Sequence, residues 1–146
     1  SHFTFGKLLG RQYDYFVGQS NYVNHEFAKN RLTNSEVRYA IFRQEYQDAP
    51  QIQLGGITGH WLHAAAKAMD EIENRAHEWQ VPALVIQAGA DLVVDNIRQT
   101  KVVAKLNACQ LQVISGAKHE LLMEQDQFRI PTLQGVLDFL AQAKLA

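Results

Sequence analysis

The chain has 146 residues, of which 47% are hydrophobic and 20% are charged. This balance excludes a disordered or collagen-like chain, and the length suits one globular domain. The 14 basic and 15 acidic residues give a net charge of −1, so we expect no nucleic-acid partner. Cys109 is the only cysteine, which excludes an intramolecular disulfide or a multi-cysteine zinc site and favours a reducing compartment.

The sequence has no segment typical of membrane insertion or export. No apolar run approaches the roughly 18 residues that a membrane-spanning helix needs, and residues 1–10 lack the order of a signal peptide. We therefore expect a cytoplasmic location. The basic residues Arg98, Lys101 and Lys105 form a stripe that is either a solvated helix face or a peripheral contact with the inner membrane.

Residues 1–79 have the pattern of helices and loops. Thr33 and Glu36 have the spacing of a capping box, which predicts a helix from Thr33 to about Gln47. One face of this helix carries three aromatic residues: Tyr39, Phe42 and Tyr46. They either pack against neighbouring elements or line a cavity for an apolar ligand.

A second helix is predicted from Thr58 to Trp79, because apolar residues recur there at spacings of three, four and seven. His60 and His63 lie three residues apart on it, a spacing that can place two metal ligands on one face. The sequence suggests no third ligand, so we expect neither a metal nor another cofactor.

From residue 80 onward the pattern changes to strand, helix, strand, helix, which indicates parallel strands with right-handed crossovers. The predicted strands are 83–87 and 111–114, and the predicted helices are 97–106, capped by Asp95, and 133–145, which follows Pro131. Parallel sheets have more strands and helices on both faces, so two strands make an incomplete sheet. We expect an α/β fold whose other strands lie outside this chain.

Asp91 and His119 follow the two predicted strands, each just beyond its carboxyl end. In parallel α/β sheets, ligands bind outside these ends, where the loops of adjacent strands meet. A carboxylate there could fix the tautomer of a histidine that takes a proton from a nucleophile. The pair has the chemistry of two members of a catalytic triad.

The stretches 81–91, 93–96 and 116–124 resemble the C-terminal part of an α/β-hydrolase, in particular its bacterial lysophospholipase and monoacylglycerol-lipase-like branch. Gly55-Gly56-Ile57-Thr58 with His60-Trp61, and residues 32–35, resemble the cap of those enzymes. The resemblance spans about residues 13–140. It implies a helical cap over residues 1–79 and the last two strands of the core over residues 80–146.

The resemblance also implies a serine ester hydrolase that needs no cofactor and acts on a lipid or ester substrate. The triad of this family has the chain order Ser, acid, His, and the last two positions match Asp91 and His119. The cap would cover the acyl chain of the substrate. Its candidate substrate-binding residues are Tyr39, Phe42, Tyr46, His60 and Trp61.

The nucleophile is missing from this pattern. A nucleophile elbow reads Gly-x-Ser-x-Gly, and none of the four serines, Ser1, Ser20, Ser35 and Ser115, has that context. Ser20 comes closest, but Tyr22 is large where the strained turn needs a small residue. We therefore expect a C-terminal fragment that is inactive alone and whose partner is the missing N-terminal half of the hydrolase.

Several alternatives stay open at this point. Asp95 could replace Asp91 as the acid, although a helix cap explains it better. Glu120 and Glu124 are expected to hold the loop in place rather than to act on substrate. The chain could also belong to an esterase or acyltransferase of other specificity, or be a hydrolase-derived assembly module that forms homodimers through exposed strand edges.

Overall fold

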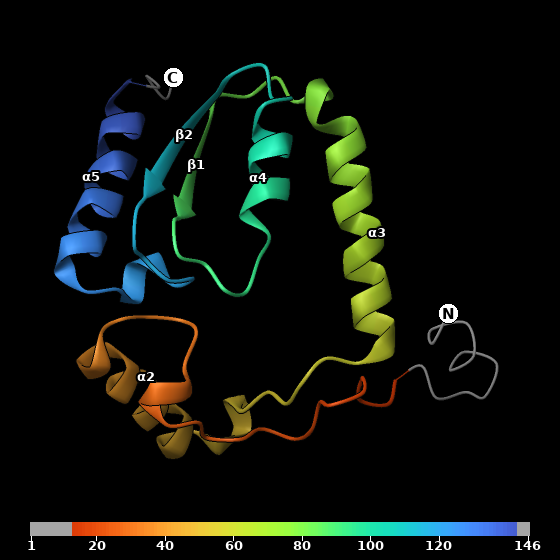
Figure 1. The fold of residues 1–146 in the computed structure, drawn as a ribbon, viewed down its shortest axis with the longest axis vertical. Helices are drawn as coiled ribbons and strands as arrows, with labels where there is room; N and C mark the ends of the chain where they lie inside the picture. The colour runs from red at the N-terminus through yellow and green to blue at the C-terminus, as the bar shows by residue number, and fades with distance from the viewer. Residues whose placement is uncertain (1–12, 143–146) are drawn as a thin grey trace.

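The computed structural model describes residues 13–142. Figure 1 shows the C-terminal half as two strands between helices, and both strands point toward the helix α2 of the N-terminal half. The long helix α3 connects the two halves along one side. Helix α2 and the loops around it therefore lie at the carboxyl ends of the strands, where an α/β fold binds its ligands.

The sheet has the predicted parallel topology. Strand β1 (Ala83–Ala88) pairs with β2 (Cys109–Ile114) in a register that runs from Ala83 opposite Cys109 to Ala88 opposite Ile114. Helix α4 (Asn96–Val103) forms the crossover between them and contacts β1, and α5 (Asp126–Gln142) contacts both strands. The strand, helix, strand, helix order predicted from the sequence is confirmed.

A small hydrophobic core lies at the carboxyl ends of the two strands. Ala88, Ile114 and Ala117 are buried, and partly buried apolar side chains surround them: Ile86, Leu121 and Phe128. The rest of the sheet is less covered, since Leu111 and Val113 of β2 are 37% and 52% exposed. Residues of a parallel strand normally lie beneath helices on both faces, so these two strands bury less than the fold requires.

The N-terminal half contains two helices joined by loops and short 3-10 turns. Helix α2 spans Glu36–Asp48, α3 spans Gly59–Arg75, and 3-10 turns cover Phe27–Lys29, Pro50–Ile52 and Ala76–Glu78. The side chain of Thr58 accepts a hydrogen bond from the N–H of Trp61, which confirms the predicted cap of α3. Within residues 13–142, no helix combines the length and apolarity needed to cross a membrane.

Two helix starts differ from the sequence prediction. Ser35, not Thr33, caps α2, because the Thr33 hydroxyl donates instead to the carbonyl of Met123. Helix α5 begins at Asp126, before Pro131, because the carbonyl of Gln125 already accepts the first helical N–H bonds. Pro131 removes one bond of the second turn without ending the helix. Residues 143–145, which the prediction included, lie outside the described residues.

Polar contacts join the two halves along α3 and α4. The Arg98 guanidinium contacts Asp70 at 2.6 Å and Glu73 at 2.8 Å, and the Lys105 ammonium donates to the carbonyl of Glu73. These groups lie at the surface. The division into a cap up to residue 79 and a core from residue 80 stays a prediction.

Candidate active site

The turns that follow β1 and β2 are bonded to each other. The N–H of Gly89 donates to the carbonyl of Ile114, and the N–H of Ala90 donates to that of Ala117. A Cβ atom at Gly89 would lie 2.9 Å from the Cα of Ser115, so only glycine permits this close approach. The turns therefore bring the residues that follow them, Asp91 and His119, to one place.

Asp91 and His119 form a hydrogen-bonded pair. His119 Nδ1 lies 2.8 Å from Asp91 Oδ2, as their positions after adjacent strands predicted. Because an ionised carboxylate only accepts hydrogen bonds, Nδ1 carries the proton and Nε2 is the basic nitrogen of the neutral ring. Nε2 forms no hydrogen bond with residues 13–142, and 29% of the His119 side chain is exposed.

The other oxygen of Asp91 is fixed by its own turn. Asp91 Oδ1 accepts hydrogen bonds from the N–H groups of Val93 at 2.7 Å and Val94 at 3.1 Å. Burial alone would raise the pKa of this carboxyl, but the bonds from His119, Val93 and Val94 outweigh burial and lower the pKa. The carboxylate is thus charged and oriented toward the ring.

The loop that carries His119 is held by a second, fully buried carboxylate. Glu124 accepts hydrogen bonds from four N–H groups at 2.8–3.0 Å: the backbone of Lys118, Asn34 and Gln125, and the side-chain amide of Asn34. We call these residues the Glu124 network. Since Lys118 precedes His119 and Asn34 precedes α2, the network ties the histidine loop to the N-terminal half.

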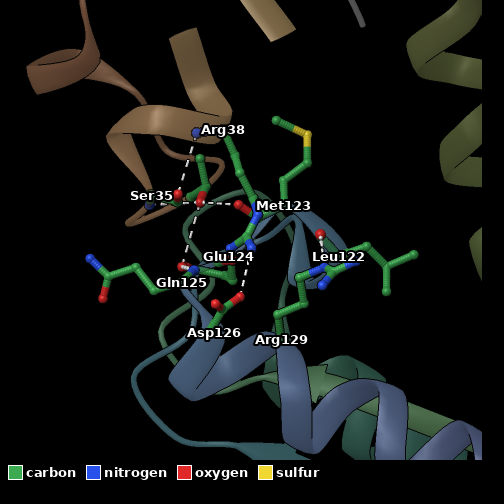
Figure 2. Close-up of polar contacts among 9 residues, drawn as sticks. Ser35, Arg38, Leu122, Met123, Glu124, Gln125, Asp126 and Arg129 are labelled. Atoms are coloured by element: carbon green, nitrogen blue, oxygen red, sulfur yellow. Dashed lines mark hydrogen bonds and ion pairs between the residues drawn. The ribbon is translucent and has the colours of Figure 1, made fainter. Parts of the chain in front are cut away.

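Arg38 strengthens the same junction from α2. Figure 2 shows its guanidinium reaching the backbone carbonyl of Glu124 and the carboxylate of Asp126, and the Asp126 contact is 2.6 Å long. The N–H of Glu120 also donates to the carbonyl of Leu32. The expectation that Glu124 holds the loop is confirmed, but the same expectation for Glu120 is not, because its side chain forms no hydrogen bond or ion pair with residues 13–142. The link of Glu124 to Asn34 was not visible in the sequence. The sequence feature that could have indicated a buried carboxylate here is the position of Glu124 directly after the apolar run Leu121–Met123.

The three aromatic residues of α2 are split between two environments. Tyr39 is 4% exposed, and its hydroxyl donates to the carbonyl of His25, so it packs inside the N-terminal half. Phe42 and Tyr46 line a hollow of about 420 Å³ together with Tyr22, whose ring stacks on Tyr46. The structure thus places two of the three beside a cavity, and the role of all three in binding substrate stays a prediction.

His60 and Trp61 lie on the first turn of α3. The His60 ring is 5.2 Å from the ring of Tyr13, and Trp61 is 56% exposed. Neither residue lines the hollow beside Phe42, so their part in substrate binding also stays a prediction. In the described part of the chain, no group of three or more His, Cys, Asp or Glu side chains is placed to hold a metal ion.

The alternatives to these assignments have structural roles of their own. Asp95 caps α4 by accepting from the N–H groups of Ile97 and Arg98, as the sequence favoured. The Ser20 hydroxyl donates to the carbonyl of Asn21, and it has no histidine partner among residues 13–142. Ser1 lies outside the described residues.

A parallel sheet with an acid and a histidine on successive strand ends, beneath a helical segment, defines part of an α/β-hydrolase fold. The family model for serine aminopeptidase, S33, matches residues 6–126. The chain belongs to this family, as the resemblance of its Asp91 and His119 segments implied.

The most similar relatives include the probable lysophospholipase L2 of Haemophilus influenzae, which is 31% identical over 94% of this chain and 44% of its own length. The lysophospholipase L2 of Escherichia coli K12 is 33% identical over 86% of this chain and 39% of its own length. The chain therefore spans less than half the length of these relatives and is lysophospholipase-like over the part that it matches.

A solved structure shows the same fold. A soluble variant of monoglyceride lipase from Saccharomyces cerevisiae, in complex with a substrate analogue, superposes with a TM-score of 0.64. The two chains are 15% identical, and the match covers 86% of this chain and 44% of the other. The described elements correspond to part of that α/β-hydrolase fold.

Proposed function

We propose that this chain is the C-terminal part of a serine ester hydrolase that deacylates lysophospholipids or monoacylglycerols. The observation that carries the proposal is the 2.8 Å bond between Asp91 and His119, which leaves His119 Nε2 without a partner among the described residues. This is the arrangement in which a histidine serves as base for a serine hydroxyl. The names of the relatives support the substrate class.

In the proposed reaction, a serine outside this chain attacks the acyl carbonyl of the substrate. His119 Nε2 takes the serine proton and then gives it to the alcohol leaving group, which leaves an acyl-serine ester. His119 then takes a proton from water, which attacks this ester, and returns the proton to the serine oxygen as the fatty acid is released. Asp91 holds Nδ1–H and stabilises the imidazolium ion that forms. No cofactor takes part in this proposal.

The incomplete sheet supports a partner for this chain. β1 and β2 pair only with each other among residues 13–142, and Val113 is half-exposed. We infer that further strands and the nucleophile elbow come from a segment that precedes these residues in the whole protein. The relatives, which are more than twice as long as the matched part, are consistent with this inference.

In this proposal, the cap and the surface near it determine which substrate binds. Tyr39, Phe42, Tyr46, His60 and Trp61 are the cap residues that we propose border the substrate. Contact with a membrane surface through Arg98, Lys101 and Lys105 remains part of the proposal, although Arg98 already pairs with Asp70 and Glu73. A lipid substrate would be met at such a surface.

The test compares the isolated chain with the whole protein that contains it. We expect the whole protein to release fatty acid from a lysophospholipid or a monoacylglycerol, and the isolated chain to release none. His119→Ala in the whole protein should reduce turnover by at least 10³-fold. Turnover that survives this substitution in a folded variant would contradict the proposal.

The assembly module is the alternative outcome, because β1 and β2 each have one neighbouring strand among residues 13–142, and their other edges could pair two copies of the isolated chain. Light scattering on the isolated chain distinguishes the two outcomes. A stable homodimer, together with a whole protein that lacks esterase activity, would favour the assembly module over the hydrolase.

A further inference from the structure

The arginine on the inner side of α2 has no counter-ion. Arg38, Arg75 and Arg98 each contact at least one carboxylate. Arg43, by contrast, has no carboxylate within 4.0 Å among residues 13–142. Arg31 and Arg129 likewise form no ion pair among these residues, but of the three only Arg43 lines the hollow beside Phe42 and Tyr46. A guanidinium in a hollow can bind an anion that a ligand supplies.

Aromatic rings hold the Arg43 guanidinium in position. Its central carbon lies 4.8 Å from the ring centre of Tyr39, 5.2 Å from that of Phe42 and 5.8 Å from that of Tyr22. Cation–π contacts of this kind stabilise the charge, but the ring faces do not replace oxygen acceptors for its N–H groups. The side chain is therefore pre-organised, with most of its donors unused.

The guanidinium of Arg43 has fewer hydrogen-bond acceptors than N–H donors among residues 13–142. Nη1 donates to the hydroxyl of Tyr22 at 3.2 Å, and Nε is hidden from solvent with no acceptor in the described part of the chain. A guanidinium has five N–H donors in a fork that matches two oxygens of a phosphate. Nη1 has one further N–H, and Nη2 forms no hydrogen bond with residues 13–142, so these are the donors that a phosphate could use.

The hollow beside Arg43 is large enough for a small polar group. It measures about 420 Å³ and is lined by the loop 18–23, by Phe42, Arg43 and Tyr46, and by residues 54–56. Its lining also includes Leu32, whose carbonyl accepts the N–H of Glu120, the residue after His119. One residue that lines the hollow, Leu32, is therefore hydrogen-bonded to the loop that carries the candidate catalytic histidine.

We propose that Arg43 binds the anionic phosphodiester of a lysophospholipid headgroup in this hollow. The proposal rests on the function proposed above and deepens it, because it distinguishes the lysophospholipid from the neutral monoacylglycerol. Arg43 supplies the charge and the fork of donors, and the rings of Tyr22, Phe42 and Tyr46 exclude water from one side. Such a charge-assisted contact would favour a phosphodiester over a neutral hydroxyl.

The test measures binding, so that it does not depend on turnover. The whole protein is titrated with two ether-linked analogues of equal, short alkyl chain, a 1-O-alkyl-glycerophosphocholine and a 1-O-alkylglycerol, below their micelle concentrations. Arg43→Gln should weaken binding of the phosphodiester analogue about tenfold and leave binding of the neutral analogue within about twofold. If the ratio of the two affinities is unchanged, the proposal is wrong.

Matched variants separate recognition from folding. Arg75→Gln removes an exposed guanidinium that pairs with Glu71 and Glu78, and it should leave both affinities unchanged. Arg43→Lys keeps the charge without the fork, so it should retain part of the preference for the phosphodiester even where Arg43→Gln is unstable. A lysine variant that loses binding of both analogues equally would assign Arg43 a structural role and overturn the proposal.

Two further outcomes separate this proposal from the others. If inorganic phosphate binds in an Arg43-dependent way while the two ether analogues bind alike, the site takes free phosphate and the headgroup assignment is wrong. If the whole protein hydrolyses neither ester, the proposed function fails. In that case the difference between the ether analogues still decides whether Arg43 recognises the phosphodiester.

Discussion

Two carboxylates act on the same histidine loop, but they face different partners. Asp91 bonds the ring of His119 with one oxygen and its own turn with the other. Glu124 is fully buried, and its four N–H partners are neutral, three of them from the backbone. One carboxylate orients the imidazole ring, and the other fixes the path of the chain that carries the ring.

This difference predicts different consequences for chemistry and for stability. Removal of the Asp91 charge would leave the fold in place but free the ring to adopt the wrong tautomer. Removal of the Glu124 charge would leave buried donors without a strong acceptor at the point where three segments meet. Substitutions in the whole protein can test whether the two roles are separate.

The largest effect is expected for Asp91→Asn. The amide cannot stabilise an imidazolium ion, so kcat should fall by about 10³ to 10⁴-fold. The variant should stay folded, with a thermal midpoint at neutral pH that is lower only by the contribution of the lost carboxylate. Steady-state kinetics with a monoacylglycerol, together with circular dichroism, would measure both. Asp95→Asn is the matched control, because Asp95 caps α4 and does not contact His119; a similar loss of kcat there would contradict the assignment.

Glu124→Gln should act mainly on stability. The amide keeps one acceptor oxygen but turns a donor toward N–H groups, so the free energy of unfolding should fall by about 2–3 kcal/mol. Because the loop before His119 loosens, kcat should also fall, by about tenfold. Urea unfolding and kinetics of the same variant would show whether stability and turnover change together.

Glu120→Gln is the control for the Glu124 substitution. Glu120 lies beside His119, but its side chain forms no hydrogen bond or ion pair with residues 13–142. Only its backbone is bonded: its N–H donates to the carbonyl of Leu32, and its carbonyl accepts from the N–H of Met123. We expect its stability and kcat to match those of the wild type. An equal effect of the two substitutions would mean that proximity to His119, rather than the Glu124 network, determines the result.

Acid should remove the contribution of Asp91 to stability. Its pKa is lowered in the folded state, so its stabilisation is complete above the unfolded value of about 3.9 and is lost as the pH falls through the lower folded value. The difference in thermal midpoint between wild type and Asp91→Asn should therefore be constant near pH 5 and shrink below about pH 4. A difference that grows with acid would contradict this sign.

The sequence predicted the elements whose cause is local. Thr58 and Asp95 were identified as helix caps, and the apolar run at 83–87 was identified as a parallel strand, because short-range patterns determine these features. The Asp91 and His119 pair was also predictable, since parallel strands end at the same edge of a sheet. The known order of the triad residues made the assignment specific.

One of the errors arose where a distant residue competes for a group. Thr33 has the spacing of a cap, yet its hydroxyl is used by Met123, ninety positions away. Pro131 predicted a helix start, but α5 begins earlier, because the N–H groups of Phe128 and Arg129 donate to the carbonyl of Gln125. The aromatic spacing of α2 likewise gave no sign that Arg43 would lie among its rings. The bond between Thr33 and Met123 joins residues far apart in sequence, so local periodicity cannot predict it. The bonds that begin α5 are local, and the prediction from Pro131 placed that start too late.

The smallest effect is expected at the surface junction between α3 and α4. Arg98 is paired with Asp70 and Glu73, but about a third of its side chain is exposed, so solvent screens the contacts. Arg98→Gln should lower the urea midpoint only slightly at low salt, and the difference should nearly vanish in about 1 M salt. The Glu124→Gln difference should persist in the same salt, because buried hydrogen bonds are little screened. If salt abolished both differences alike, the contrast between a buried and an exposed junction would be wrong.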